Sequence, residues 1–170
     1  MRVFKISKTS KKLLNREVLK EVEQRGGVLL AINKADEVEI TANEEENGGA
    51  EWIAEQVVRA LIYGFEAKYA YKLFSDEYFL ETIDLNNAFR RKEKGIERAK
   101  SRIIGEAGTA RKKLEELSET HIMVSNSTDN VSILGKFEEL QNAKEAIIRL
   151  LEGSPHESVY RFLESKNKEY

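Results

Sequence analysis

The sequence predicts an α+β fold in which one small module occurs twice, each copy a three-stranded sheet backed by helices. Short apolar runs of strand length alternate with segments of helical periodicity. Their order, strand-helix-helix-strand-strand-helix, appears in both halves of the chain, and equivalent apolar positions are 92 residues apart. The matched pairs are Val22 with Leu114, Leu30 with Ile122, and Ile32 with Val124. We therefore expect two domains, residues 1–75 and 76–170.

The first half provides every element of that order. Val18, Leu19 and Val22 mark the buried face of a helix, and Gly26-Gly27 ends it. Continuous or alternating apolar residues predict the strands, and the last helix has an apolar stripe. The other predicted segments are a strand at 2–6, a basic run at 8–12, strands at 28–32 and 38–40, a polar loop at 43–49, and a helix at 52–64.

The second half repeats the order and adds a final helix. It predicts a strand at 79–85, a basic helix at 96–104, a helix buried through Ala110, Leu114 and Leu117, strands at 121–124 and 131–134 around the loop 125–130, and a long helix at 137–151. Residues 65–74 predict a helix between the modules. Ser154 is expected to cap the last helix, with Pro155 at its first position and Glu157 closing a capping box.

Composition limits the setting of the protein. With 41% hydrophobic and 34% charged residues, the 170-residue chain has enough apolar material for a packed core. The chain has no cysteine, so disulfides and thiolate metal sites are excluded and a reducing, cytoplasmic location is expected. No signal peptide or membrane span is apparent, which predicts a soluble protein without a membrane partner.

Charge is unevenly distributed along the chain. The formal net charge is -2, yet residues 90–113 carry ten basic and three acidic residues. This local excess of positive charge has two interpretations, a solvated helix face or a contact surface for nucleic acid.

A glycine loop inside the basic stretch favours the nucleic-acid interpretation. Gly105-Glu106-Ala107-Gly108 lies between the two predicted helices of the second module, which is the arrangement of a type I KH domain. The glycines let the backbone approach a sugar-phosphate chain, and the next helix directs its N-terminal N–H groups at phosphate. We therefore predict two tandem type I KH modules, the second of which clamps single-stranded RNA.

The predicted RNA-binding residues comprise the loop, nearby cations and an apolar groove wall. They are Lys100, Arg102, Ile103, Ile104, Gly105, Glu106, Ala107, Gly108, Arg111, Lys112, Ile122 and Val124. Glu106 places a negative charge where phosphate would lie and is expected to weaken binding, with Arg102, Arg111 and Lys112 in compensation.

The first module lacks this loop. At the offset of 92, the corresponding segment is Leu13-Leu14-Asn15-Arg16, without glycine. We expect a structural module that does not clamp RNA, although Lys8, Lys11, Lys12 and Arg16 leave non-specific phosphate contact open.

An enzyme is the rival interpretation, and the sequence offers it little. His121 and His156 are the only histidines, and no phosphate loop, nucleophile elbow or zinc motif is present. We expect no catalytic residue, metal or cofactor. The acidic loop at 43–49 leaves open a basic protein partner. Two further alternatives are a protein-interaction scaffold of the pre-ribosome with little RNA affinity of its own and a general single-stranded RNA-binding protein.

Three stretches carry a family resemblance beyond the generic KH pattern. They are Gly64-Phe65-Glu66-Ala67 through Asp76-Glu77-Tyr78-Phe79 to Leu85, then Arg102-Ile103-Ile104-Gly105 through Gly108, then Gly153-Ser154-Pro155-His156-Glu157 to Glu164. In them the chain resembles archaeal KH-domain rRNA-processing proteins, relatives of the eukaryotic small-subunit assembly factor called the partner of Nob. The resemblance implies binding near the 3′ end of small-subunit rRNA, beside a Nob-type endonuclease, with a degenerate first KH module.

Overall fold

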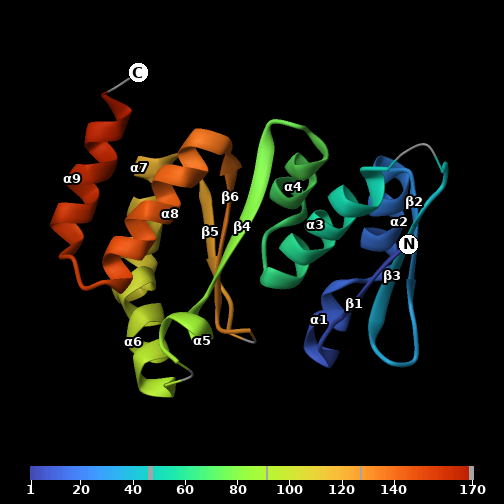
Figure 1. The fold of residues 1–170 in the computed structure, drawn as a ribbon, viewed down its shortest axis with the longest axis horizontal. Helices are drawn as coiled ribbons and strands as arrows, with labels where there is room; N and C mark the ends of the chain where they lie inside the picture. Colours follow the sequence, from blue (N-terminus) through green and yellow to red (C-terminus); the bar gives the residue numbers. More distant parts are fainter. Residues whose placement is uncertain (46–47, 91, 127, 169–170) are drawn as a thin grey trace. The chain divides into compact units, whose positions relative to one another are not determined.

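The computed structural model describes residues 1–45, 48–90, 92–126 and 128–168, and it divides into two compact units, Met1–Asp76 and Glu77–Tyr170. Figure 1 traces both units along the chain. No helix in the described ranges is long and apolar enough to cross a membrane. Part of the predicted acidic loop at 43–49 and Arg91 of the basic stretch lie outside the described residues.

Unit 1 is a three-stranded antiparallel sheet with its helices on one face. Its elements are β1 (Arg2–Lys5), α1 (Lys8–Leu13), α2 (Arg16–Gly26), β2 (Val28–Ile32), β3 (Glu37–Ala42), α3 (Ala50–Tyr63), α4 (Ala67–Ala70) and the 3-10 helix η1 (Tyr71–Phe74). The strands lie in the order β1-β3-β2. Val22, Val38 and Ile40 are fully buried between sheet and helices, so the central strand carries the core.

Unit 2 has the same sheet order, β4-β6-β5, and more helices. Its elements are β4 (Tyr78–Asp84), α5 (Leu85–Ala88), α6 (Glu93–Ile104), the 3-10 helix η2 (Glu106–Gly108), α7 (Thr109–Ser118), β5 (His121–Val124), β6 (Asn130–Lys136), α8 (Phe137–Leu151) and α9 (His156–Asn167). The helices α6, α7 and α8 cover one face of the sheet, and α9 packs on the outer side of α7 and α8 (Figure 1).

Each unit contains the same kind of contact between a side chain and an edge strand. The residues of the two contacts are 92 positions apart in the chain. In unit 1 the Glu23 carboxylate accepts the backbone N–H of Leu30 at 2.8 Å. In unit 2 the Glu115 carboxylate accepts the backbone N–H of Ile122 at 2.9 Å. Each carboxylate lies on the helix that precedes the edge strand, α2 or α7, and accepts an N–H of that strand that faces away from the rest of the sheet. Such a bond covers part of an otherwise open sheet edge.

The predicted helix at 65–74 is confirmed for residues 67–74, which form α4 followed directly by η1. It begins two residues later than predicted, because Gly64 (φ 104°) ends α3 and the Phe65 N–H closes that end on the Ala60 carbonyl at 3.1 Å. The predicted cap of the last helix is wrong. Ser154 lies one residue before the N-cap of α9, where its N–H donates to the Arg149 carbonyl at the end of α8 at 2.9 Å, and no side chain caps α9, so the predicted capping box does not form. Pro155 is the N-cap of α9 instead.

Candidate nucleic-acid interface

The glycine loop of unit 2 adopts a conformation that requires its glycines. Gly105 has φ 72° and ψ 178°, a region that is essentially restricted to glycine. A Cβ at Gly105 would lie 2.6 Å from the Ala110 Cβ, so the loop also packs tightly on the first turn of α7. Ala107 (φ 52°) and Gly108 (φ 75°) are both left-handed, and a Cβ at Gly108 would meet nothing within 4 Å. Gly108 therefore faces open space.

The loop is closed by its own hydrogen bonds and leaves the start of α7 accessible. The Thr109 hydroxyl donates to the Glu106 carbonyl at 2.8 Å, and the Gly108 N–H donates to the Gly105 carbonyl at 3.3 Å. Gly108 is the N-cap of α7, and no side chain caps this end. The Glu106 and Ala107 side chains are exposed. An uncapped helix N-terminus beside a bare backbone is a suitable position for an anion.

The equivalent junction of unit 1 is built differently. Asn15 is the N-cap of α2, and its side-chain oxygen accepts the Val18 N–H at 2.9 Å. No residue of this junction has a positive φ. The side chain of Asn15 therefore occupies the position from which the first N–H groups of α2 could reach a phosphate.

Arg102 was predicted to contact phosphate, and in the structure its guanidinium binds two backbone carbonyls of unit 2. Its Nη1 donates to the Leu150 carbonyl at 2.7 Å, and its Nη2 donates to the Ser154 carbonyl at 2.8 Å. The backbone carbonyl of Arg102 in turn contacts His156 Nε2 at 2.8 Å. Arg102 thus joins α6 to the turn between α8 and α9, because two carbonyls at a helix end attract a cation.

Lys100 and Arg111 are also engaged within unit 2. Lys100 forms an ion pair of 2.7 Å with Asp129 in the loop between β5 and β6. Arg111 Nη1 donates to the Ile122 carbonyl at 3.1 Å and lies 3.7 Å from Glu115. Together Arg111 and Glu115 therefore bind both backbone groups of Ile122 on the edge strand. Glu115 was not among the predicted residues, although its offset of 92 from Glu23 would have indicated it.

The predicted groove wall is only partly at the surface. Ile103 and Ile122 are both 0% exposed and lie in the hydrophobic core of unit 2, so their predicted place on the wall is corrected to a place beneath it. Ile104 and Val124 are half-buried and reach the surface. Lys112 is exposed and forms no ion pair with the residues that the structure describes.

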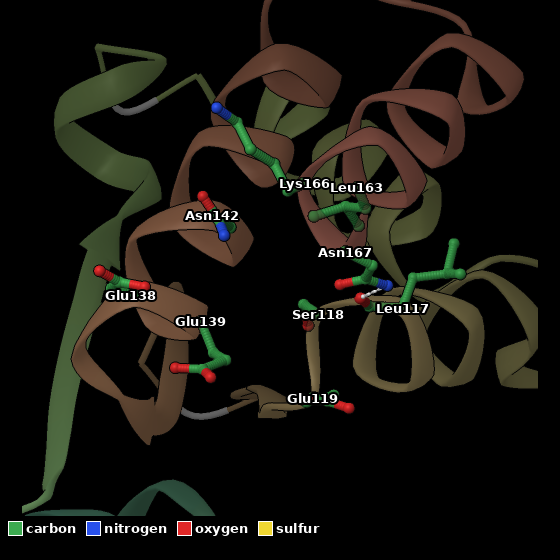
Figure 2. Close-up of a pocket in the computed structure, with 9 residues that line it drawn as sticks. All are labelled: Leu117, Ser118, Glu119, Glu138, Glu139, Asn142, Leu163, Lys166 and Asn167. Carbon is green, nitrogen blue, oxygen red and sulfur yellow. Dashed lines mark hydrogen bonds between the residues drawn. The ribbon is translucent and has the colours of Figure 1, made fainter. Parts of the chain in front are cut away.

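A hollow of about 390 Å³ lies at the other end of α7 from the glycine loop. Figure 2 shows it between the end of α7, the start of α8 and the end of α9, with the carboxylates of Glu119, Glu138 and Glu139 around it. The Asn167 side chain closes one side by donating to the Leu117 carbonyl at 2.9 Å. Three carboxylates beside one lysine, Lys166, disfavour an RNA backbone at this position.

Histidine and metal chemistry find no support in the described parts of the chain. No group of three His, Asp or Glu side chains there is placed to hold a metal ion. His156 packs 6.1 Å from the Tyr160 ring at the start of α9, which is a structural position.

Comparison with known proteins identifies the family. Residues 79–168 match a family model described as a eukaryotic type KH-domain, type I, the second KH domain of PNO1. A KH domain-containing protein of Methanocaldococcus jannaschii is 38% identical over 89% of this chain and 66% of its own length. The RNA-binding protein PNO1 of Oryzias latipes is 33% identical over 75% of this chain and 52% of its own. The chain thus spans half to two thirds of these relatives.

Solved structures agree with this assignment over nearly the whole chain. Dim2p of Pyrococcus horikoshii has a TM-score of 0.85 at 34% identity, with 96% of this chain and 98% of that one covered. A chain of the a/eIF2alpha-aDim2p-rRNA complex from the same organism has a TM-score of 0.87 at 33% identity, with 99% and 94% covered. The chain belongs to the family of KH-domain proteins that includes PNO1 and Dim2p.

Proposed function

We propose that this chain is an RNA-binding ribosome-assembly factor that binds single-stranded small-subunit rRNA near its 3′ end during pre-rRNA processing. The carrying observation is the Gly105–Gly108 loop, whose bare, left-handed backbone lies against an uncapped helix N-terminus. The names of its relatives support the biological setting, since they include a pre-rRNA-processing protein of Coccidioides immitis and a complex that contains rRNA.

The architecture we propose is two tandem type I KH modules, residues 1–75 and 76–170, of which the first is degenerate. The same strand order in both sheets and the same bond from Glu23 and Glu115 to an edge strand support a duplication. The first module lacks the clamp because Asn15 fills the junction. The first module then has a structural role and does not bind RNA through a glycine loop.

Within the second module, we propose that the loop residues and Lys112 contact the phosphates. Ile104 and Val124 provide the apolar surface for the bases, with Ile103 and Ile122 supporting it from the core. Lys100 and Arg111 limit the groove through their bonds to Asp129 and Ile122. We further propose that the chain acts in the cytoplasm, beside a Nob-type endonuclease and without a catalytic role of its own; its resemblance to the family supports the endonuclease as a neighbour.

Filter binding tests the clamp with a single-stranded oligoribonucleotide of the small-subunit rRNA 3′ end. Gly108→Asp places a carboxylate where phosphate would lie without a steric clash, because the site is open. Gly108→Asn is the matched neutral control, since Asn tolerates the left-handed region. We expect binding that weakens steeply with salt, weakens about a hundredfold in Gly108→Asp, and is largely kept in Gly108→Asn. Equal binding by both variants would contradict the clamp.

A scaffold with little RNA affinity is the alternative, and two observations favour it. Glu106 is exposed inside the loop, and three of the predicted cations are engaged within unit 2. Glu106→Gln separates the two functions, because removal of a like charge should strengthen binding by a true clamp. Unchanged, negligible binding would indicate a scaffold.

A further inference from the structure

The cations of the basic stretch at 90–113 fall into two groups in the structure. One group is engaged within unit 2: Lys100 with Asp129, Arg102 and Arg111 with backbone carbonyls, and Lys113 over the Tyr160 ring at 4.6 Å. The other group is exposed and forms no ion pair in the described ranges: Arg90, Lys92, Lys94, Arg98 and Lys112. Most of the available positive charge therefore lies before and along α6, not at the loop itself.

The helix α6 separates this charge into two faces. Lys94, Arg98 and Arg102 follow one another at intervals of four residues and so share one face. Glu93, Glu97 and Lys100 border a separate hollow of about 330 Å³ that also includes Asp129. The first face consequently forms a line of cations that runs from the glycine loop toward the start of α6.

An apolar hollow of about 300 Å³ lies beside this line. Its lining includes Phe89, Gly95, Arg98, Arg102, Leu150 and Leu151. A Cβ at Gly95 would lie 3.0 Å from the Phe89 ring, so the absence of a side chain lets the ring pack directly on the helix. The two carbonyl bonds of Arg102 fix one wall. Arg98 is exposed, and it also borders a second hollow with Lys94, Glu97, Ser101 and Arg102, so one carboxylate lies beside the cations on this face.

We propose that this corner of α5, α6 and α8 binds one unpaired nucleotide of an RNA strand that leaves the Gly105–Gly108 loop. The base lies against Phe89 and Leu151, and the adjacent phosphates lie at Lys94 and Arg98. An aromatic ring with neighbouring cations is the combination that binds single-stranded nucleic acid. An acidic protein segment would use the cations but has no need of a flat apolar wall.

The distance from the glycine loop to Lys94 along α6 suits a single RNA strand that contacts both. Lys94 precedes Gly105 by eleven residues, which at the rise of an α-helix corresponds to roughly 16 Å. The clamp itself holds about four nucleotides. The corner therefore extends the binding site to flanking nucleotides and rests on the proposed function of the loop.

Two oligoribonucleotides separate the corner from the clamp. One contains only the four nucleotides that the loop would hold, and the other extends beyond them on either side. We expect Lys94→Ala/Arg98→Ala to weaken binding of the longer RNA about tenfold and to reduce its salt slope by about 1.4, since each phosphate contact on a single strand contributes roughly 0.7. Binding of the short RNA should not change.

A second variant tests the apolar wall with a different measurement. Phe89→Leu keeps an apolar side chain but removes the aromatic face, so a 2-aminopurine placed in the flanking segment should lose the fluorescence quenching that stacking produces. Lys20→Ala/Lys34→Ala removes the same charge from exposed positions of unit 1 and is the matched control. It should leave the salt slope and the quenching unchanged.

The outcomes distinguish the corner from the proposed clamp. If Lys94→Ala/Arg98→Ala and Phe89→Leu both bind the longer RNA like wild type, the corner is not an RNA site. If Gly108→Asp binds normally while the corner variants do not, the clamp fails and the corner stands. If an acidic peptide competes with the longer RNA and Phe89→Leu has no effect on quenching, the partner at the corner is a protein and the proposal is overturned.

Discussion

The two helix junctions, Leu14-Asn15 in unit 1 and Gly105–Gly108 in unit 2, occupy the same place in the same strand order and differ in what they expose. Asn15 covers the start of α2 with its own side chain, whereas the start of α7 has no side-chain cap. The surrounding scaffold is alike, down to the carboxylate that binds the edge strand in each unit. The fold therefore does not require the glycine loop, because unit 1 keeps the strand order and the edge-strand contact without it.

The largest expected effect comes from placing the same charge in both junctions. Gly108→Asp should weaken RNA binding about a hundredfold, ~2.7 kcal/mol, because like charges a few ångströms apart in partial solvent repel by this order. Asn15→Asp adds the same charge in unit 1 and keeps the cap, since Asp and Asn cap helices equally well. Filter binding should show no change for Asn15→Asp. A loss of affinity in Asn15→Asp would mean that the first junction also touches RNA.

The second-largest expected effect distinguishes the roles of Arg102 and Lys112, two cations of the basic stretch. Arg102→Ala removes two charge-assisted hydrogen bonds to the turn after α8, which should lower the free energy of unfolding of unit 2 by about 2 kcal/mol. Lys112→Ala should leave that stability unchanged and reduce the salt slope of RNA binding by roughly 0.7. Urea unfolding and binding measured across a salt series give the two quantities. An unchanged stability in Arg102→Ala would contradict the structural role of this arginine.

A smaller effect is expected from the cap of unit 1. Asn15→Ala removes the acceptor of the Val18 N–H and should destabilise unit 1 by about 1 kcal/mol, and Asn15→Gly by only a few tenths. Trp52, the one tryptophan of the chain, lies in α3 and reports unfolding of unit 1 by fluorescence. RNA affinity at temperatures where unit 1 stays folded should be the same for all three proteins. Equal stability of the alanine and glycine variants would argue against a capping role.

The smallest expected effect is a loss of unit 1 stability at acidic pH. Burial raises the pKa of the Glu55 carboxyl, but hydrogen bonds from Arg2 and Arg59 outweigh it and hold the pKa below its usual value of 4.5. The ionised carboxylate therefore stabilises unit 1 above the unfolded pKa, and this contribution is lost as pH falls through the lower folded pKa. Both arginines are partly exposed, and solvent therefore limits the size of this contribution to stability.

Glu55→Gln tests this contribution. Because the variant has no titrating carboxyl, its stability followed by Trp52 fluorescence should decline less than that of wild type between pH 5 and pH 3. Unit 2 has no carboxylate at the equivalent position, because the 92-residue offset places Ile147 of α8 there, and Ile147 is fully buried. A wild-type profile as flat as that of Glu55→Gln would show that the ion pairs of Glu55 do not stabilise unit 1.

How far the sequence predicts the structure depends on the range of the interaction. Strands β2 and β5 and helix α8 have the predicted bounds, because continuous apolar runs and regular spacing specify them locally. The three strands of each unit and the Gly105–Gly108 loop between α6 and α7 also lie close to the predicted positions. Local patterns were sufficient wherever backbone propensity and apolar burial decide the outcome.

The failures involve partners that are distant in the chain. Arg102 finds its acceptors at Leu150 and Ser154, and the turn that holds Ser154 depends on how α8 ends. The depth of Ile103 and Ile122 depends on how α6 and β5 pack together, which apolar periodicity does not distinguish from a surface groove. Long basic side chains can reach several acceptors, so a count of cations in a segment overestimates those available to a ligand.

The close packing of Gly105 on Ala110 restricts which residues the loop accepts. A Cβ at Gly105 would lie 2.6 Å from the Ala110 Cβ and 2.9 Å from the Ala110 backbone nitrogen, so a smaller side chain at position 110 would not make room for one at position 105. Any residue other than glycine at position 105 must therefore shift the backbone of the first turn of α7. In unit 1 the residues at the same offset are Leu13, which lies in α1, and Val18, so that junction follows a different backbone path. The identity of one residue thus decides whether the start of the following helix can keep its position.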